Sequence, residues 1–345
     1  MGGDRAPAMV VDGLDIASER HPGARFLLVG DEAQVRPLLE RSRRAKAVCT
    51  IRHAPDVIGN DMKPTAALRA RNSSMRIAID AVAAGEASGV VSAGNTGALL
   101  TLSKIVLKTL PGIDRPAMAA IGPSARGDVV LLDLGANVQC DVRNLVQFAV
   151  MGDVFARTVL GLTAPTIGLL NVGSEELKGD DTLREAAAVL RASHIGPQFH
   201  GFVEGNDIAA GTTDVVVTDG FTGNVALKLI EGVSQATLGA IRDVAVASPR
   251  GRLGGLLLSG GLRSFREEID PERQGGAYLL GLRQLGVLAH GSFTRHGIAR
   301  AILRARRGAE EDLVGRTHRA LEAAGALRRA DLASATSATV LRGDP

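Results

Sequence analysis

The chain has 345 residues, 45% of them hydrophobic, which is enough to form one large α/β domain or two ordinary ones. Its 40 basic and 37 acidic residues nearly cancel and only 3% of its residues are aromatic, which argues against a protein that binds nucleic acid by charge and base stacking. We find no signal peptide and no long uncharged apolar run, so we expect no membrane-spanning helix. Cys49 and Cys140 lie far apart and show no zinc or redox spacing, which fits a reducing cytoplasm.

The first third of the sequence alternates between expected helices and strands. Residues 1–7 are typical of a turn, and residues 9–16 of a helix. Apolar runs at residues 25–30 and 47–53 predict buried strands, with a helix over residues 32–44 between them. A further helix is expected over residues 76–84, with Ser73 or Ser74 as its N-cap. This alternation predicts a sheet of parallel strands connected by helices.

Four strands expected further along each end in a turn that combines glycine with Asn, Asp, Ser or Thr. The strands are at residues 89–91, 129–132, 166–170 and 215–217, and the turns at 92–97, 133–137, 171–176 and 219–224. Ordinary loop chemistry explains any one of these turns taken singly. Because a parallel sheet collects its turns at the carboxyl edge, the four together predict an active site there.

The turn at residues 219–224 joins a valine-rich strand to an expected helix. The first N–H groups of a helix lack intrahelical partners and the helix dipole is positive there, which predicts an oxyanion site. The candidate donors are side chains of the four turns, with one lysine as the charge: Asn95, Thr96, Asn137, Asn171, Ser174, Thr222, Asn224 and Lys178. A phosphate held in this way could attack a thioester or ester carbonyl while Lys178 and Asn224 stabilise the oxyanion.

Other catalytic motifs are absent or ambiguous. The sequence contains no GxxxxGK[ST], no GxSxG and no dinucleotide fingerprint, so we predict no protein nucleophile and no cofactor. Glu175 and Glu176 are more typical of solvent-facing carboxylates than of Mg²⁺ ligands, so no metal site is predicted. His290 is either a base or phosphate ligand or a structural residue.

Basic runs at residues 41–46 and 300–307 are either solvated helix faces or docking sites for an acidic partner.

The last third of the chain has a different character. Helical sequence to residue 246, a break at residues 248–251 and a second helical run at 253–265 predict a helical hairpin over about residues 229–271. Leucines beside arginines in this hairpin suit a membrane surface or a protein groove, or else a dimer interface or the core. Residues 275–281 are interpreted as a glycine-flanked turn and residues 287–290 as a last strand, followed by helices at 296–306 and 310–327. We expect one domain over residues 1–329 and a disordered tail over 330–345.

Five motifs, in order along nearly the whole chain, resemble the bacterial phosphate acyltransferase family PlsX. They are SAGNTGA at residues 92–98, LDLGAN at 132–137, GLLNVG at 168–173 followed by Glu176, Lys178 and Gly179, DGFTGN at 219–224, and AHGS at 289–292. The resemblance implies transfer of a fatty acyl group from acyl-acyl-carrier protein to inorganic phosphate. The acyl phosphate so formed would supply a membrane glycerol-3-phosphate acyltransferase in phospholipid synthesis.

The resemblance also implies a fold, an assembly and a site. The expected fold is a three-layer α/β/α Rossmann-like one, similar to isopropylmalate dehydrogenases and phosphotransacetylases, with a protruding helical hairpin. We expect a cytoplasmic homodimer that associates peripherally with the inner face of the cell membrane. Lys178 and Asn224 are the implied catalytic pair. The implied substrate- and phosphate-binding residues are Ser92, Asn95, Thr96, Gly97, Asn137, Asn171, Gly173, Glu176, Thr222, Gly223 and His290.

This sequence also departs from the family pattern. Family members open with a strand that ends in Asp-x-Met-Gly-Gly-Asp, of which only residues 1–4 remain here. We therefore expect exposed sheet edges and a gain in stability when the N-terminus is extended. Arg5, Gln274 and Tyr278 stand where other residues are usual, which affects acyl-chain preference and loop shape rather than the reaction. Two alternatives remain, a phosphotransacetylase acting on acyl-coenzyme A and a non-catalytic scaffold that binds carrier protein.

Overall fold

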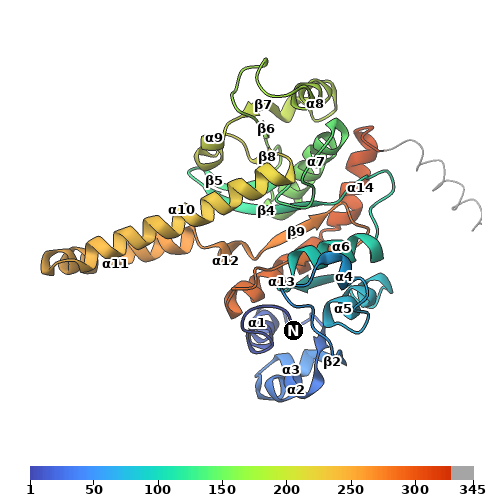
Figure 1. Ribbon diagram of the computed structural model, residues 1–345, viewed down its shortest axis with the longest axis vertical. Coiled ribbons are helices and arrows are strands. Elements are labelled where there is room, and N and C mark those ends of the chain that lie inside the picture. Colours follow the sequence, from blue (N-terminus) through green and yellow to red (C-terminus); the bar gives the residue numbers. More distant parts are fainter. Residues whose placement is uncertain (328–345) are drawn as a thin grey trace, which may run out of the picture.

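The computed structural model describes residues 1–327, which form an α/β fold with helices on both faces of a central sheet (Figure 1). The tail expected over residues 330–345 lies outside the described residues. The three layers predicted for the chain are confirmed.

The N-terminal part of the chain alternates helices and strands as the sequence predicts. Ser73 accepts a hydrogen bond from the N–H group of Arg76, which confirms it as an N-cap. The elements of this part are α1 (Ala8–Arg20), β1 (Phe26–Gly30), α2 (Glu32–Arg41), α3 (Ala45–Val48), β2 (Cys49–His53), α4 (Pro64–Ala67), α5 (Ser74–Ala83), β3 (Gly89–Ser92) and α6 (Thr96–Val106).

The rest of the chain adds most of the central sheet and the longest helices. The middle elements are β4 (Ala117–Ser124), β5 (Gly127–Leu132), α7 (Val142–Phe155), the π-helix η1 (Ala156–Leu160), β6 (Ile167–Leu170), α8 (Asp181–Ala192), the 3₁₀-helix η2 (Gly196–Gln198), β7 (Phe199–Val203), α9 (Gly205–Ala210) and β8 (Val215–Val217). The last are α10 (Gly220–Val246), α11 (Pro249–Glu268), α12 (Pro271–Gln274), β9 (Ala277–Leu280), β10 (Leu285–Leu288), α13 (Arg295–Glu310) and α14 (Leu313–Ala323).

The central sheet has the order β3-β10-β9-β4-β5-β8-β6-β7, and β1 and β2 form a separate parallel pair. Strands β4 and β9 run antiparallel to each other, and each is also antiparallel to its other neighbour, β5 and β10 respectively. These three reversals make β5, β8 and β6 point opposite to β3 and β10. The expectation that all four turns lie at one carboxyl edge is therefore wrong, because the sheet is mixed rather than parallel.

Two strands explain this difference. The sequence pattern does not predict β4. The glycines that flank residues 275–281 predict a turn, yet Ala277–Leu280 is the fully buried strand β9. Gly275 and Gly281 both have positive φ, so they form the bends at either end of this strand and not its interior.

Each face of the sheet is covered by its own group of buried apolar side chains. Phe148 and Phe155 of α7 pack on one face together with α1, α8, α13 and α14. Leu99 and Leu102 of α6 pack on the other face with α5 and α9. The Val215–Val217 strand is buried on both faces, as its three consecutive valines predict.

The predicted helical hairpin is confirmed and projects from the body of the molecule (Figure 1). Its first helix, α10, has 27 residues, so it is about 40 Å long, and α11 packs back against it. Leu256 and Leu257 of α11 are 70% and 78% exposed. None of the helices in residues 1–327 is long and apolar enough to cross a membrane.

The first residues of the chain lie against the ends of β1, β3 and β10. The Asp4 N–H group donates to the carbonyl of Gly291. A Cβ on Gly2 would lie 2.4 Å from Cα of Gly94, and one on Gly30 would lie 2.8 Å from the Met1 side chain. Strands β1 and β3 do not pair with each other in the described structure, so each presents an unpaired strand edge, as the sequence predicts.

Candidate active site

The N-terminus of α10 is packed directly onto the loop that follows β5. The Gly220 N–H group donates to the Asn137 carbonyl over 2.7 Å. A Cβ on the buried Gly223 would lie only 1.9 Å from the carbonyl oxygen of Asp133, so only glycine fits there. This packing leaves Asn224 exposed on the first turn of α10, with its side chain beside Gly135.

Asp133 organises the loop at residues 133–137. Its fully buried carboxylate accepts hydrogen bonds from the backbone N–H groups of Met118, Ala136 and Asn137 and from the Asn137 side chain. Burial raises the pKa of this carboxyl, and the N–H groups that point at it oppose the shift. The Asn137 amide also donates to the Pro116 carbonyl over 2.8 Å. Both N–H bonds of that amide are thus used inside the protein, so Asn137 positions the loop instead of donating to phosphate.

Lys178 lies on the loop after β6, the strand next to β8. The Asn171 amide donates to the Lys178 carbonyl and its oxygen accepts from the Val172 N–H group, which makes Asn171 a support for this loop. Gly179 has φ of +82°, and a Cβ there would lie 2.4 Å from the Asn171 oxygen. The Lys178 side chain is 55% exposed, and its Nζ lies 4.0 Å from Glu175. Its amino group is therefore accessible to a ligand.

The remaining residues predicted on this loop have structural partners. Glu176 forms an ion pair of 3.0 Å with Arg191 and so is not directed at a phosphate. A Cβ on Gly173 would lie 2.6 Å from Glu175 and 3.1 Å from Lys178, so this glycine allows the loop to close tightly.

The anion site expected at the start of α10 is occupied by a side chain of the protein itself. The Asp219 carboxylate accepts hydrogen bonds from the Thr222 N–H group and hydroxyl, over 2.9 and 2.7 Å. Asp219 is thus the N-cap, and Thr222 is not available as a phosphate donor in this arrangement. Lys228, one helical turn after Asn224, forms an ion pair with Glu231.

The other predicted residues lie at the opposite edge of the sheet, after β3 and β10. Asn95 caps α6 by accepting from the Ala98 N–H group, and its amide nitrogen lies within hydrogen-bonding distance of the Gly59, Asn60 and Met62 carbonyls. Thr96 is exposed at the first position of α6.

The residues near them are also engaged in local packing. Ser92 accepts from the Gly94 N–H group, and Gly97 fits closely against Pro64. His290 is exposed, and its Nδ1 contacts the Ser292 hydroxyl over 2.8 Å. These residues form a second polar cluster, on segments that follow strands pointing opposite to β6 and β8.

Two cationic residues that the sequence pattern does not indicate lie beside the edge of the sheet at which α10 begins, here called the α10 edge. Helix α6 runs from the β3 end of the sheet back to this edge, which places Lys104 of its last turn here. Lys104 and Arg115 line a cavity of about 440 Å³, whose other lining residues are Ala136, Asn137, Val138 and Gln139. A single lysine within the apolar sequence of α6 was the one available signal for this position.

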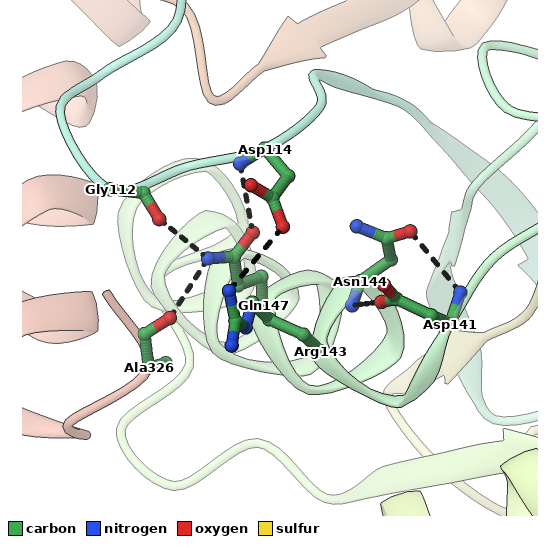
Figure 2. A network of polar contacts seen from close by, with 7 residues as sticks. All are labelled: Gly112, Asp114, Asp141, Arg143, Asn144, Gln147 and Ala326. Atoms are coloured by element: carbon green, nitrogen blue, oxygen red, sulfur yellow. Dashed lines mark hydrogen bonds and ion pairs between the residues drawn. The ribbon is translucent and has the colours of Figure 1, made fainter. Parts of the chain in front are cut away.

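A buried glutamine holds the segment that leads to Arg115 (Figure 2). The Gln147 amide of α7 donates to the carbonyls of Gly112 and Ala326 over 2.9 and 2.8 Å, and its oxygen accepts from the Asp114 N–H group. The Asp114 carboxylate lies 3.9 Å from Arg143. This network fixes the backbone immediately before Arg115.

Cys140 is the cysteine nearest to this edge. Its Sγ lies 3.8 Å from the Asn137 carbonyl oxygen. Burial raises the pKa of the thiol to about 12, with a further contribution from Asp133. The thiol is therefore protonated at neutral pH and is a poor nucleophile.

Comparisons with known proteins agree on one family. Residues 1–316 match the family described as Fatty acid synthesis protein. The chain is 65% identical over 302 residues to the phosphate acyltransferase of Granulibacter bethesdensis, covering 88% of this chain and 82% of that protein. It is 63% identical over 302 residues to the phosphate acyltransferase of Acidiphilium cryptum, covering 88% and 80%.

Solved structures with a similar fold include a phosphotransacetylase from Streptococcus pyogenes, with a TM-score of 0.61 at 17% identity over 89% of this chain and 92% of that one. The EutD phosphotransacetylase from Staphylococcus aureus has a TM-score of 0.51 at 14% identity, over 88% and 99% of the two chains. At such low identity these likenesses show the fold alone.

Proposed function

The chain belongs to the fatty acid synthesis protein family, with relatives named phosphate acyltransferase at 65% and 63% identity, and we propose that it transfers a fatty acyl group from acyl-acyl-carrier protein to inorganic phosphate. A phosphate oxygen attacks the thioester carbonyl carbon, the C–O bond forms, and the C–S bond breaks. The products are acyl phosphate and the carrier-protein thiolate, which takes up a proton. The family match over residues 1–316 carries this proposal.

Lys178 and Asn224 are the proposed catalytic pair. Both are exposed, and they lie on the segments that follow the adjacent parallel strands β6 and β8. The Lys178 ammonium group neutralises the attacking phosphate, and the Asn224 amide donates a hydrogen bond to the oxygen of the tetrahedral intermediate. The raised pKa of Cys140 supports direct attack by phosphate over a route through an acyl-cysteine.

Substitution of the two proposed catalytic residues tests this assignment. We expect Lys178→Ala to lower kcat by about a hundredfold or more with no change in melting temperature, since the side chain is exposed. Asn224→Asp, which keeps the shape but replaces the amide donor by a negative charge, is expected to lose more activity than Asn224→Ala. Lys228→Ala is the matched control, because Lys228 pairs with Glu231. Full turnover by Lys178→Ala would remove that residue from the mechanism.

Two other functions are distinguished by the donor that the protein accepts. A higher kcat/KM with acyl-coenzyme A than with acyl-carrier protein would make the protein a phosphotransacetylase. Binding of carrier protein with no turnover of either donor would make it a scaffold. The phosphotransacetylase structures do not favour the first alternative, because they share only the fold.

The hairpin of α10 and α11 is proposed to mediate a homodimer. Val225, Leu229 and Val233 of α10 are each more than half exposed and recur every fourth residue, so they form one apolar stripe along the helix. Such a stripe suits packing against the same helix of a second copy. Leu229→Asp should convert a dimer to a monomer in sedimentation equilibrium, and a wild-type protein that is monomeric at all concentrations would contradict the proposal.

The tip of the hairpin is proposed to contact the membrane peripherally, from the cytoplasmic side. Leu253, Leu256, Leu257 and Leu258 of α11 are all at least 61% exposed, and arginines flank them. This contact would place the acyl phosphate product near a membrane glycerol-3-phosphate acyltransferase. Leu257→Asp should reduce co-sedimentation with anionic vesicles, and equal binding by the wild type and the variant would argue against a role for this helix.

A further inference from the structure

The cavity beside the α10 edge combines two positive charges with no acidic lining residue. Its lining consists of Lys104, Arg115 and residues 136–139, which carry no carboxylate. Neither Lys104 nor Arg115 forms an ion pair with another residue of the described 1–327 segment. Arg115 donates one N–H bond to the Gln139 carbonyl over 3.1 Å, which holds its guanidinium at the cavity wall. This arrangement favours an anionic ligand.

The cavity is large enough for a ligand bigger than inorganic phosphate. A volume of about 440 Å³ lies within the range of small-molecule sites, which begins near 300 Å³. The side-chain amide of Gln139 in the lining offers a polar group to an extended ligand that itself carries amides. A single phosphate ion would leave most of this space to solvent.

The cavity is connected to the proposed catalytic pair through one short loop. Asn137 lies in the cavity wall, and a Cβ added to Gly135, two residues earlier, would lie 3.7 Å from the Asn224 side chain. A flexible arm that lies along residues 135–139 would therefore have one end at the two cations and the other near Asn224.

We propose that this cavity binds the pantetheine arm of the acyl donor, with Lys104 and Arg115 contacting the phosphate at the end of the arm remote from the thioester. The proposal rests on the proposed acyl transfer, because it assigns a donor to that reaction. The Gln147 network supports it by fixing the backbone that carries Arg115 before the donor arrives (Figure 2).

The test compares two minimal donors, octanoyl-pantetheine and octanoyl-4′-phosphopantetheine, which differ only in the phosphate. The wild type should show a KM for the phosphorylated donor lower by about tenfold or more, as charge-assisted hydrogen bonds predict. Lys104→Ala/Arg115→Ala should lose most of this preference. Lys63→Ala/Arg126→Ala, which removes the same charge from exposed positions elsewhere, should keep it. An equal preference in the wild type and the Lys104→Ala/Arg115→Ala variant would overturn the proposal.

A second measurement distinguishes binding of inorganic phosphate at the two cations from binding of the acyl donor. If the two cations bound the attacking phosphate, the double variant would raise the KM for inorganic phosphate and keep the preference between donors, which would also overturn the proposal. Should the double variant unfold, Lys104→Glu alone changes an exposed side chain and gives the same comparison.

A binding measurement keeps this inference distinct from the proposed reaction. Titration calorimetry with 4′-phosphopantetheine, which has no acyl group, requires no turnover. Binding by the wild type that is weakened about tenfold or more in the double variant supports the site even if no acyl transfer is seen, in which case the proposed function alone fails. No difference in binding between the two proteins would contradict the site, whatever the activity.

Discussion

Gly223→Ala tests whether the close packing of α10 on the β5 loop sets the geometry of the active site. The added Cβ would lie 1.9 Å from the Asp133 carbonyl oxygen, whereas real Cβ contacts are not shorter than about 3.0 Å. The start of α10 must therefore move by more than about 1 Å, because the backbone opposite is held in place: the Asp133 N–H group donates to the Thr218 carbonyl and the Leu132 carbonyl accepts from the Thr218 N–H group. Overpacking of this kind costs about 1–3 kcal/mol.

We expect a larger effect on catalysis than on stability. A displacement of about 1 Å at Asn224 can lower kcat by about a hundredfold, while the loss of stability corresponds to a melting temperature lower by about 2–10 °C. Steady-state assays and thermal unfolding measure the two effects. Gly232→Ala, where nothing lies within 4 Å, is the matched control in the same helix and should retain activity and gain slightly in stability. Wild-type kcat in Gly223→Ala would show that this packing does not set the position of Asn224.

Three further predictions concern a thiol, a buried amide and a carboxylate. Cys140→Ser should keep most of the activity, because burial raises the thiol pKa to about 12; a loss of about a hundredfold would indicate a covalent route. Gln147→Met should lower the unfolding free energy in urea by about 2 kcal/mol or more, since it leaves the Gly112 and Ala326 carbonyls without the amide donor; an unchanged midpoint would contradict the network. The Thr212 hydroxyl and the Glu204 N–H group lower the pKa of Asp207, so its contribution to stability is present above the unfolded-state pKa and is lost as pH falls through the folded-state pKa. Asp207→Asn should therefore make the decline of unfolding free energy below about pH 4 shallower, and an unchanged slope would argue against this carboxylate.

Local sequence patterns predicted most of the fold. The valine triplet of β8 and the Ser73 cap each depend on interactions within a few residues, and both agree with the structure. The break predicted at residues 248–251 is shorter in the structure, because α11 already begins at Pro249. Strand β9 does not follow from such local patterns, because its flanking glycines are typical of a turn. Its identity depends on pairing with β4, which is distant in sequence, as well as with the neighbouring β10. That one strand, together with β4, decides which turns share an edge of the sheet.

Local sequence patterns also could not decide the roles of the residues in the candidate active site. Short polar side chains after a strand predict both ligand binding and helix capping, and for Asn95 and Asp219 the structure shows capping. Lys104 and Arg115 could not be grouped from the sequence, since they meet only because α6 crosses the sheet from one edge to the other. The assignment of Lys178 and Asn224 stays a prediction, supported by their exposure on adjacent segments.

The most direct measurement is the release of free carrier-protein thiol from palmitoyl-acyl-carrier protein with and without inorganic phosphate, with hydroxylamine present to trap acyl phosphate. We predict release that depends on phosphate, a trapped hydroxamate in equal amount, and loss of both in Lys178→Ala. Release of free fatty acid without phosphate, or no release by a folded wild-type protein, would contradict acyl transfer to phosphate.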